Sequence, residues 1–247
     1  MRNYLYYVLF FVFVTVSAHA EYRILAFGDS NTWGWKPMGG GERFTDAKRW
    51  TGVMAAQLDD DYTVITDGLV ARRTDLDGLD TKLVEGSFLN GAKTLPPAII
   101  RNAPIDLVIL FLGTNDLQLG AERSAEEVAA AVAGLANLVA DSGGLLYSAY
   151  EAPAEVWIVA PPALGDLSGT PLEGLFSVGV EASKQLSSAF QEMAASTDLK
   201  VFYCDQILDG AVGADGIHLT EAGHAKLGKA IAESLTDRFD QTELLSQ

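Results

Sequence analysis

Five short apolar runs, separated by segments of helical periodicity, constrain the fold of this chain more than any other feature of its sequence. The runs are Arg23–Phe27, Tyr62–Thr66, Leu107–Leu112, Val156–Ala160 and Lys200–Cys204. Their apolar residues are continuous rather than alternating with polar ones. This pattern is typical of parallel strands that are buried on both faces of a sheet.

The segments between and after these runs carry apolar residues at helical spacing. The apolar residues share one face in each of three stretches, namely Val128, Val132, Leu135 and Val139; Leu186, Phe190 and Met193; and Leu227, Ile231 and Leu235. Ser124 and Glu127 form a capping-box pattern at the start of the first stretch, and Gly143 and Gly144 follow its end. The alternation predicts an α/β fold, a three-layer sandwich with a central parallel sheet of about five strands and helices on both faces.

The first twenty residues differ from the rest of the chain and predict a secretory signal peptide. Arg2 is their only charged residue, Tyr4–Val16 is almost wholly apolar, and Ala18-His19-Ala20 has the A-x-A pattern of a cleavage site. An uncleaved membrane anchor is the alternative, but the apolar run is shorter than the roughly 18–20 residues that cross a bilayer. We therefore expect residues 1–20 to be removed, and residues 21–247 to form one exported domain, secreted or periplasmic, without a stable membrane anchor.

Charge and residue types exclude several kinds of partner. The formal charge of −16 disfavours nucleic acid. After residue 20 the chain holds two histidines and one cysteine and lacks an H-E-x-x-H motif, so no metal site is expected. No G-x-G-x-x-G motif follows a strand, so a dinucleotide is not indicated and we expect no cofactor. Cys204 ends an apolar run and is predicted to be an inert core residue rather than a nucleophile.

Four polar segments follow predicted strands, where the ligand crevice of an open parallel sheet lies. They are Gly28-Asp29-Ser30-Asn31, Asp67-Gly68, Gly113-Thr114-Asn115-Asp116 and Asp215-Gly216-Ile217-His218. Because the carboxyl ends of parallel strands meet at one edge, we expect these segments to lie close together.

Three of these residues have the chemistry of a serine nucleophile with its base and acid. Ser30 ends a strand-to-turn step, although its motif taken alone is more often turn and helix-cap chemistry. His218 follows Asp215 by three residues, so the carboxylate can hold the ring across one turn. The alternative for that segment is a loop that caps the last helix. His224 lies on the apolar face of the last helix and is predicted to be a packing or helix-start residue.

An oxyanion that develops during acyl transfer needs hydrogen-bond donors. We assign this role to the backbone N–H groups of Ser30 and Gly68 and to the side-chain amide of Asn115. Glycine and asparagine are also ordinary turn formers, which is the alternative for both. Asp116 is predicted to tie down its loop.

Aromatic residues flank the proposed site in the sequence and predict an apolar pocket for an acyl or aryl group. They are Trp33, Trp35, Phe44, Trp50 and Phe88, of which Trp33, Trp35 and Phe88 are assigned to the pocket. Trp50 begins a helical stretch and is predicted to pack in the core. The polar, glycine-rich segment between Trp33 and Arg49 is predicted to be a lid or an oligomer contact.

The four polar segments together resemble the SGNH (GDSL) hydrolases, in which Ser, Gly, Asn and His come from four ordered blocks. Here these residues are Ser30, Gly68, Asn115 and His218. The resemblance covers nearly the whole chain after residue 20. It implies an SGNH hydrolase domain with a flavodoxin-like fold over residues 21–247.

A closer likeness is to the arylesterase and acyltransferase branch of that family. It rests on Phe27–Ser30, Arg49–Val53, Leu89–Ala92 and Asp215–Thr220. Val70 and Arg73 depart from the branch, which has small or hydroxyl residues at these positions.

This likeness implies a serine esterase that hydrolyses short-chain acyl or aryl esters through an acyl-enzyme. It also implies acyl transfer to alcohols or peroxide as a further activity, small-molecule esters as partners, and a homo-oligomer. Two alternatives stay open, which are a carbohydrate deacetylase that uses the same residues and a non-catalytic module that binds carbohydrate or lipid.

Overall fold

The computed structural model describes residues 21–142, 153–210 and 212–245, so the predicted signal peptide and Gly143-Gly144 lie outside the described residues. Its strands are β1 (Tyr22–Gly28), β2 (Tyr62–Gly68), β3 (Leu107–Phe111), β4 (Glu155–Ala160) and β5 (Lys200–Tyr203). They form one parallel sheet in the order β2-β1-β3-β4-β5. This is the order of flavodoxin-like folds, and it confirms the five predicted strands to within two residues at each end.

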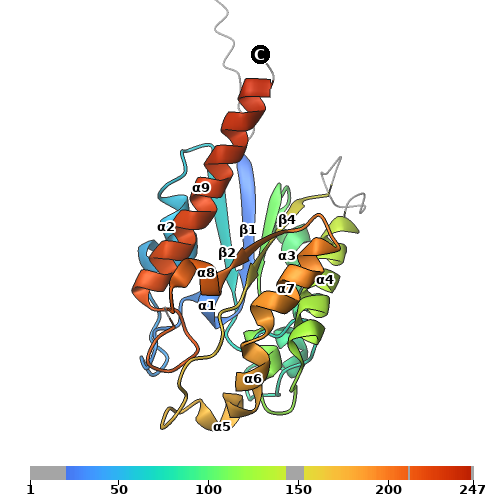
Figure 1. The fold of residues 1–247 in the computed structure, drawn as a ribbon. Helices are drawn as coiled ribbons and strands as arrows, with labels where there is room; N and C mark the ends of the chain where they lie inside the picture. The colour runs from blue at the N-terminus through green and yellow to red at the C-terminus, as the bar shows by residue number, and fades with distance from the viewer. Residues whose placement is uncertain (1–20, 143–152, 211, 246–247) are drawn as a thin grey trace, which may run out of the picture.

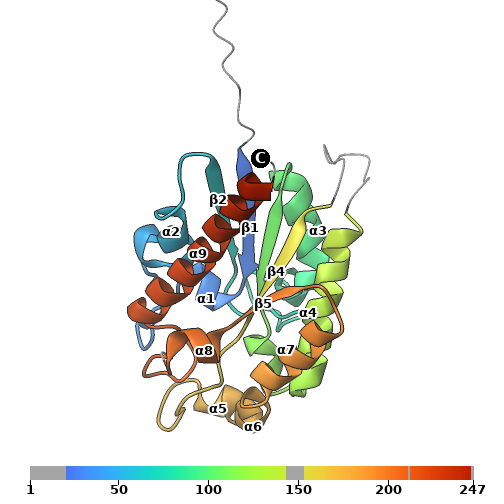
Figure 2. The same ribbon diagram turned by 45° about the horizontal axis from the view of Figure 1, so that its top comes forward.

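Helices cover both faces of the sheet and give the three predicted layers (Figure 1). The α-helices of the described residues are α1 (Ser30–Trp33), α2 (Trp50–Ala55), α3 (Gly91–Asn102), α4 (Ala125–Ala140), α5 (Glu173–Phe176), α6 (Val180–Ser183), α7 (Leu186–Ala195), α8 (Cys204–Leu208) and α9 (Glu221–Leu245). Helices α3, α4 and α7 pack on one face, and α2, α8 and α9 on the other (Figure 2).

The residues predicted to face the core from the helices do so. Val128 and Val139 of α4 and Leu227 and Leu235 of α9 are fully buried, whereas Met193 of α7 is only partly buried. The capping box at the start of α4 is present, with both of its reciprocal hydrogen bonds. Helix α4 is therefore stabilised both at its start and along its apolar face.

Burial of the strands differs between the middle and the edges of the sheet. Strands β1, β3 and β4 have almost wholly buried residues, but every residue of β2 is half-buried and Lys200 of β5 is exposed. The prediction that all five strands are buried on both faces is therefore wrong for β2 and β5. Each of these strands has a neighbour on one side only and lies at the rim of the helical layers, where water reaches it.

The carboxyl ends of all five strands meet at one edge of the sheet, where α1, α5 and α6 also lie (Figure 1). Cys204 is fully buried at the start of α8, one residue beyond β5, and burial raises the pKa of its thiol well above the ordinary value. Within the described parts of the chain, no helix is both long and apolar enough to cross a membrane.

Candidate active site

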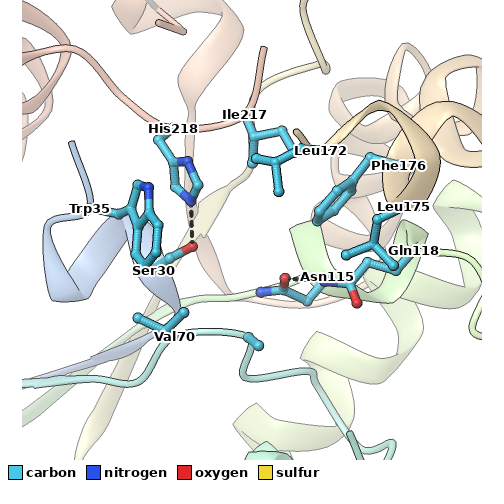
Figure 3. Close-up of a pocket in the computed structure, with 11 residues that line it drawn as sticks. Ser30, Trp35, Val70, Asn115, Gln118, Leu172, Leu175, Phe176, Ile217 and His218 are labelled. Atoms are coloured by element: carbon cyan, nitrogen blue, oxygen red, sulfur yellow. Dashed lines mark hydrogen bonds between the residues drawn. The ribbon is translucent and has the colours of Figure 1, made fainter. Parts of the chain in front are cut away.

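A pocket lies at the carboxyl edge of the sheet and brings together residues from all the strand-end segments except the one at Gly68 (Figure 3). It is lined by Ser30, Trp35, Val70, Ala71, Asn115, Gln118, Leu172, Leu175, Phe176, Ile217 and His218. Ser30 and His218 form one side of it, and Asn115 and Gln118 form another.

Ser30 is presented to the pocket by a tight turn between β1 and α1. Asp29 accepts a hydrogen bond from Asn31 N at 2.9 Å, which caps this one-turn helix. Gly28 is required here, because a Cβ on residue 28 would lie 2.1 Å from Thr32 Oγ1. The turn therefore places the serine at the end of a buried strand with its hydroxyl toward the pocket.

Ser30, His218 and Asp215 form a hydrogen-bonded chain. His218 Nε2 lies 3.0 Å from Ser30 Oγ, and His218 Nδ1 lies 2.7 Å from Asp215 Oδ2. The other oxygen of Asp215 accepts the N–H groups of Ile217 at 3.1 Å and His218 at 3.0 Å. Burial raises the pKa of Asp215, but these hydrogen bonds together with the charge of His218 lower it below its ordinary value overall. The carboxylate is thus held ionised against the imidazole.

Neighbouring residues fix the histidine relative to the serine. Asn31 Oδ1 accepts the N–H of Leu219 at 2.9 Å, which joins the nucleophile turn to the histidine loop. Trp35 stacks on the His218 ring at 5.5 Å between centroids, and Met38 N lies 3.4 Å from Asp215 Oδ2. The segment between Trp33 and Arg49, predicted to be a lid or an oligomer contact, therefore lies against both the base and the acid.

Asn115 lies across the pocket from His218, in the 3₁₀ turn Thr114–Leu117 after β3. Its Nδ2 donates to Arg72 O at 3.0 Å and lies 3.4 Å from Asp29 Oδ2. Asp116 binds the N–H and hydroxyl of Thr74, so it ties down the loop as predicted.

Asp29, whose Oδ2 lies near the Asn115 amide, is fully buried, and this burial raises the pKa of its carboxyl to about 6.

Gly68 ends β2 but does not line the pocket, which corrects the place predicted for it. Leu69 N donates to Gly28 O at 3.0 Å, so the N–H of Gly68 points to the opposite side, the open edge of the sheet. Glycine is needed there because a Cβ would lie 2.2 Å from Trp33 N of α1. The chain reaches the pocket two and three residues later, at Val70 and Ala71, and Ala71 has the left-handed φ of +64°.

Two of the three predicted pocket aromatics lie elsewhere. Trp33 packs beside Trp35 with the Arg43 guanidinium 4.8 Å from its ring, and Phe88 is 58% exposed; neither lines the pocket. Their assignment to the pocket rests on proximity in sequence, which does not determine the direction of a side chain. Trp50 is fully buried in the core as predicted, and only Trp35 is a pocket residue.

The apolar wall opposite Trp35 was not predicted. It comes from Leu172, Leu175 and Phe176, which follow β4, and from Ile217 beside the histidine. The signal that would have found the first three is their position after a buried strand. Apolar residues at that position suit core packing equally well, so residue type alone does not mark them as pocket residues.

His224 is fully buried near the start of α9. Its Nδ1 accepts the N–H of Trp50 at 3.3 Å, and Phe44 packs edge-on against its ring. Burial, together with the charges of Arg49 and His218, lowers the pKa of His224 to about 3. The prediction of a packing residue near the helix start is confirmed.

A parallel α/β sheet with serine, histidine and aspartate hydrogen-bonded at its carboxyl edge is the architecture of a serine hydrolase. Within the described parts of the chain, no three His, Cys, Asp or Glu side chains cluster closely enough to hold a metal ion. The apolar pocket beside the serine can hold the acyl or alcohol part of an ester.

Comparison with known proteins agrees with this class. Residues 26–226 match the GDSL-like lipase/acylhydrolase family, and the chain belongs to that family. It is therefore a carboxylic ester hydrolase of the SGNH type. No curated protein matches the chain.

Solved structures with the same fold include two esterases of more than one-third sequence identity. Est24, a carbohydrate acetylesterase from Sinorhizobium meliloti, is 37% identical, with a TM-score of 0.78 over 87% of this chain and 99% of that chain. The aryl esterase of M. smegmatis is 36% identical, with a TM-score of 0.79 over the same shares of the two chains.

Proposed function

We propose that the protein is a serine esterase that acts on short-chain acyl or aryl esters, with Ser30 as nucleophile, His218 as base and Asp215 as the acid that orients it. The observation that carries this proposal is the chain of hydrogen bonds from Asp215 through His218 to Ser30 at the edge of an apolar pocket. Membership of an acylhydrolase family supports it.

The reaction has two halves. Ser30 Oγ attacks the ester carbonyl carbon while His218 Nε2 takes the hydroxyl proton, and the alcohol then leaves with that proton. In the second half, water attacks the carbonyl carbon of the acyl-enzyme while His218 Nε2 takes its proton. The bond to Ser30 Oγ then breaks, Ser30 regains that proton, and the acid is released. Asp215 stays ionised throughout and stabilises the imidazolium, in keeping with its lowered pKa.

Three donors are proposed for the oxyanion. They are the Ser30 N–H, the Asn115 amide, and the backbone N–H of Ala71, which takes the role first assigned to Gly68. Asn115 and Ala71 both line the pocket beside Ser30. Preorganised donors of this kind usually supply the largest part of the rate enhancement in acyl transfer.

The size of the pocket supports a small acyl or aryl group. Its volume is about 120 Å³, which is close to that of an apolar cavity of roughly 150 Å³ that holds benzene. Its walls at Leu172, Leu175 and Phe176 are apolar. A long acyl chain would have to extend into water.

Nitrophenyl esters of increasing chain length test this preference. We expect a higher kcat/KM for acetyl and butyryl esters than for the C12 ester, and no turnover of any of them by Ser30→Ala. A higher kcat/KM on C12 than on C4 would contradict the short-chain assignment and leave the serine mechanism in place.

Carbohydrate acetyl esters are the second candidate substrates. They are favoured by the 37% identity to a carbohydrate acetylesterase. Acetate release from peracetylated sugars and from nitrophenyl acetate, measured at equal concentrations, decides between the two substrate classes. A non-catalytic binding module is not proposed, because the chain belongs to a family of hydrolases.

Acyl transfer is proposed as a competing activity, because apolar walls beside the acyl-enzyme favour an alcohol over water. The ratio of transfer ester to free acid, measured with a vinyl ester and a primary alcohol in buffer, tests it. We also propose export after cleavage behind Ala20, which is tested by sequencing the amino terminus of the protein from its native host.

A further inference from the structure

The amide of Asn115 has two ends of opposite polarity and similar size. If its NH₂ group faces the reacting carbonyl oxygen, it stabilises the developing negative charge; if its own oxygen faces it, the charge is repelled. An oxyanion donor of this kind therefore works only when its rotation about the last side-chain bond is fixed.

The contacts of Asn115 identify what fixes each end. The NH₂ group has acceptors in Arg72 O at 3.0 Å and Asp29 Oδ2 at 3.4 Å. The oxygen accepts from Gln118 Nε2 at 2.5 Å, which is the shortest of the three contacts. Figure 3 shows the nitrogen of Asn115 on the side of Ser30 and the oxygen on the side of Gln118.

Gln118 is itself an amide with two possible orientations, and a cation determines which one it adopts. Arg73 Nη2 lies 3.4 Å from Gln118 Oε1, and a guanidinium can only donate. The Gln118 oxygen must therefore face Arg73, which leaves its NH₂ group for Asn115. Arg73 is held in turn by its Nη1, which donates to Asp77 O at 3.1 Å.

The three residues linked by these hydrogen bonds are all buried. Asn115 is 5% exposed, and Gln118 and Arg73 are each 7% exposed. In such surroundings hydrogen-bonded dipoles polarise one another, and an unpaired carbonyl is costly. Removal of the Gln118 donor would leave the Asn115 oxygen without this partner, and the amide would be held only at its NH₂ end, by Arg72 O and Asp29.

We propose that Gln118, oriented by Arg73, is a positioning residue that holds the Asn115 amide with its NH₂ group toward the oxyanion. This inference rests on the proposed function, because it assumes that Asn115 stabilises the oxyanion.

A double-mutant cycle tests the proposal, with Gln118→Met as the main variant because methionine keeps the length of the side chain and lacks a donor. We expect kcat on a nitrophenyl ester to fall by roughly 10-fold to 10²-fold with KM little changed, as expected for an interaction made in the transition state. In the Asn115→Ala background the same change should lower kcat less than about twofold, because no amide remains to be oriented.

Two further variants separate positioning from a purely structural role. Arg73→Lys keeps a donor and should retain most activity, whereas Arg73→Met should lower kcat in the same direction as Gln118→Met. Gln57→Met is the matched control, since Gln57 is exposed and far along the chain. If Gln118→Met unfolds, Gln118→Glu keeps the size and the contact with Arg73 but presents only acceptors, and the same loss of kcat is expected.

Equal losses of kcat in the wild-type and Asn115→Ala backgrounds would overturn the proposal, because Gln118 would then act independently of Asn115. A change confined to KM would overturn it as well and assign Gln118 to substrate binding. Failure of the proposed function gives a different result, since Ser30→Ala would then keep its esterase activity.

Discussion

His224→Gln should make the protein less sensitive to acid while leaving catalysis at neutral pH largely intact. Burial lowers the pKa of His224 from 6.5 to about 3, so the folded protein holds this ring neutral. The unfolded chain binds a proton there below about pH 6.5. Stability is therefore unaffected by this group above pH 6.5 and is lost as the pH falls from there toward 3.

The size of the effect follows from the linkage between proton binding and folding. At pH 4.5 the unfolded-state pKa of 6.5 lies about two units above the pH, whereas the folded-state pKa of about 3 lies below it. Proton binding therefore stabilises the unfolded state alone, by about 2–3 kcal/mol. Glutamine keeps an acceptor for the N–H of Trp50 and does not titrate. The loss of stability between pH 7.5 and 4.5 should be smaller in the variant by about that amount.

Urea unfolding of both proteins at pH 7.5, 6.0 and 4.5 measures this difference. Other titrating groups, such as Asp29 with its raised pKa, are present in both proteins and cancel in the comparison. Identical losses of stability in the two proteins would refute the assignment of a buried neutral ring. A variant that loses esterase activity at pH 7.5 while staying folded would instead make His224 part of the catalytic machinery.

The other predictions concern rate and reactivity. His218→Ala should lower kcat by roughly 10⁴ or more, because the base is lost and only oxyanion donors and binding remain; steady-state kinetics on nitrophenyl acetate measures this, and a loss below about tenfold would contradict it. Asn115→Ala should lower kcat by roughly 10²–10³ with little change in KM; an unchanged kcat would make Asn115 only a loop residue. Cys204 should resist iodoacetamide in the folded protein and react after denaturation, because burial raises its thiol pKa; rapid alkylation of native protein, seen by mass spectrometry, would contradict its burial.

The sheet could be predicted because its signals are local. Each strand appears as a continuous apolar run, and the polar residues that follow β1 and β3 had to meet at one edge once the strands were taken as parallel. The pairing of Asp215 with His218 was also accessible, because one turn of chain joins them. These inferences need only the identity and order of neighbouring residues.

The pocket walls could not be predicted in the same way, because they depend on side-chain direction. Phe88 lies close to the site in the printed sequence but faces solvent, while Phe176 comes from a distant segment and lines the pocket. The sequence predicts that Gly68 brings a bare backbone N–H to the pocket, yet its missing side chain serves the close packing of α1 against β2. The left-handed turn at Ala71 has no signal in its residue type, because alanine rarely adopts that conformation.

Labelling with a fluorophosphonate probe tests the central claim most directly, since the probe reacts only with a serine activated by a base. We expect stoichiometric loss of esterase activity and a single modified peptide that carries the probe on Ser30. Ser30→Ala should not be labelled, and His218→Ala should be labelled far more slowly than the wild-type protein. Modification of a different residue, or full esterase activity in Ser30→Ala, would contradict the assignment of Ser30, His218 and Asp215 as the catalytic residues.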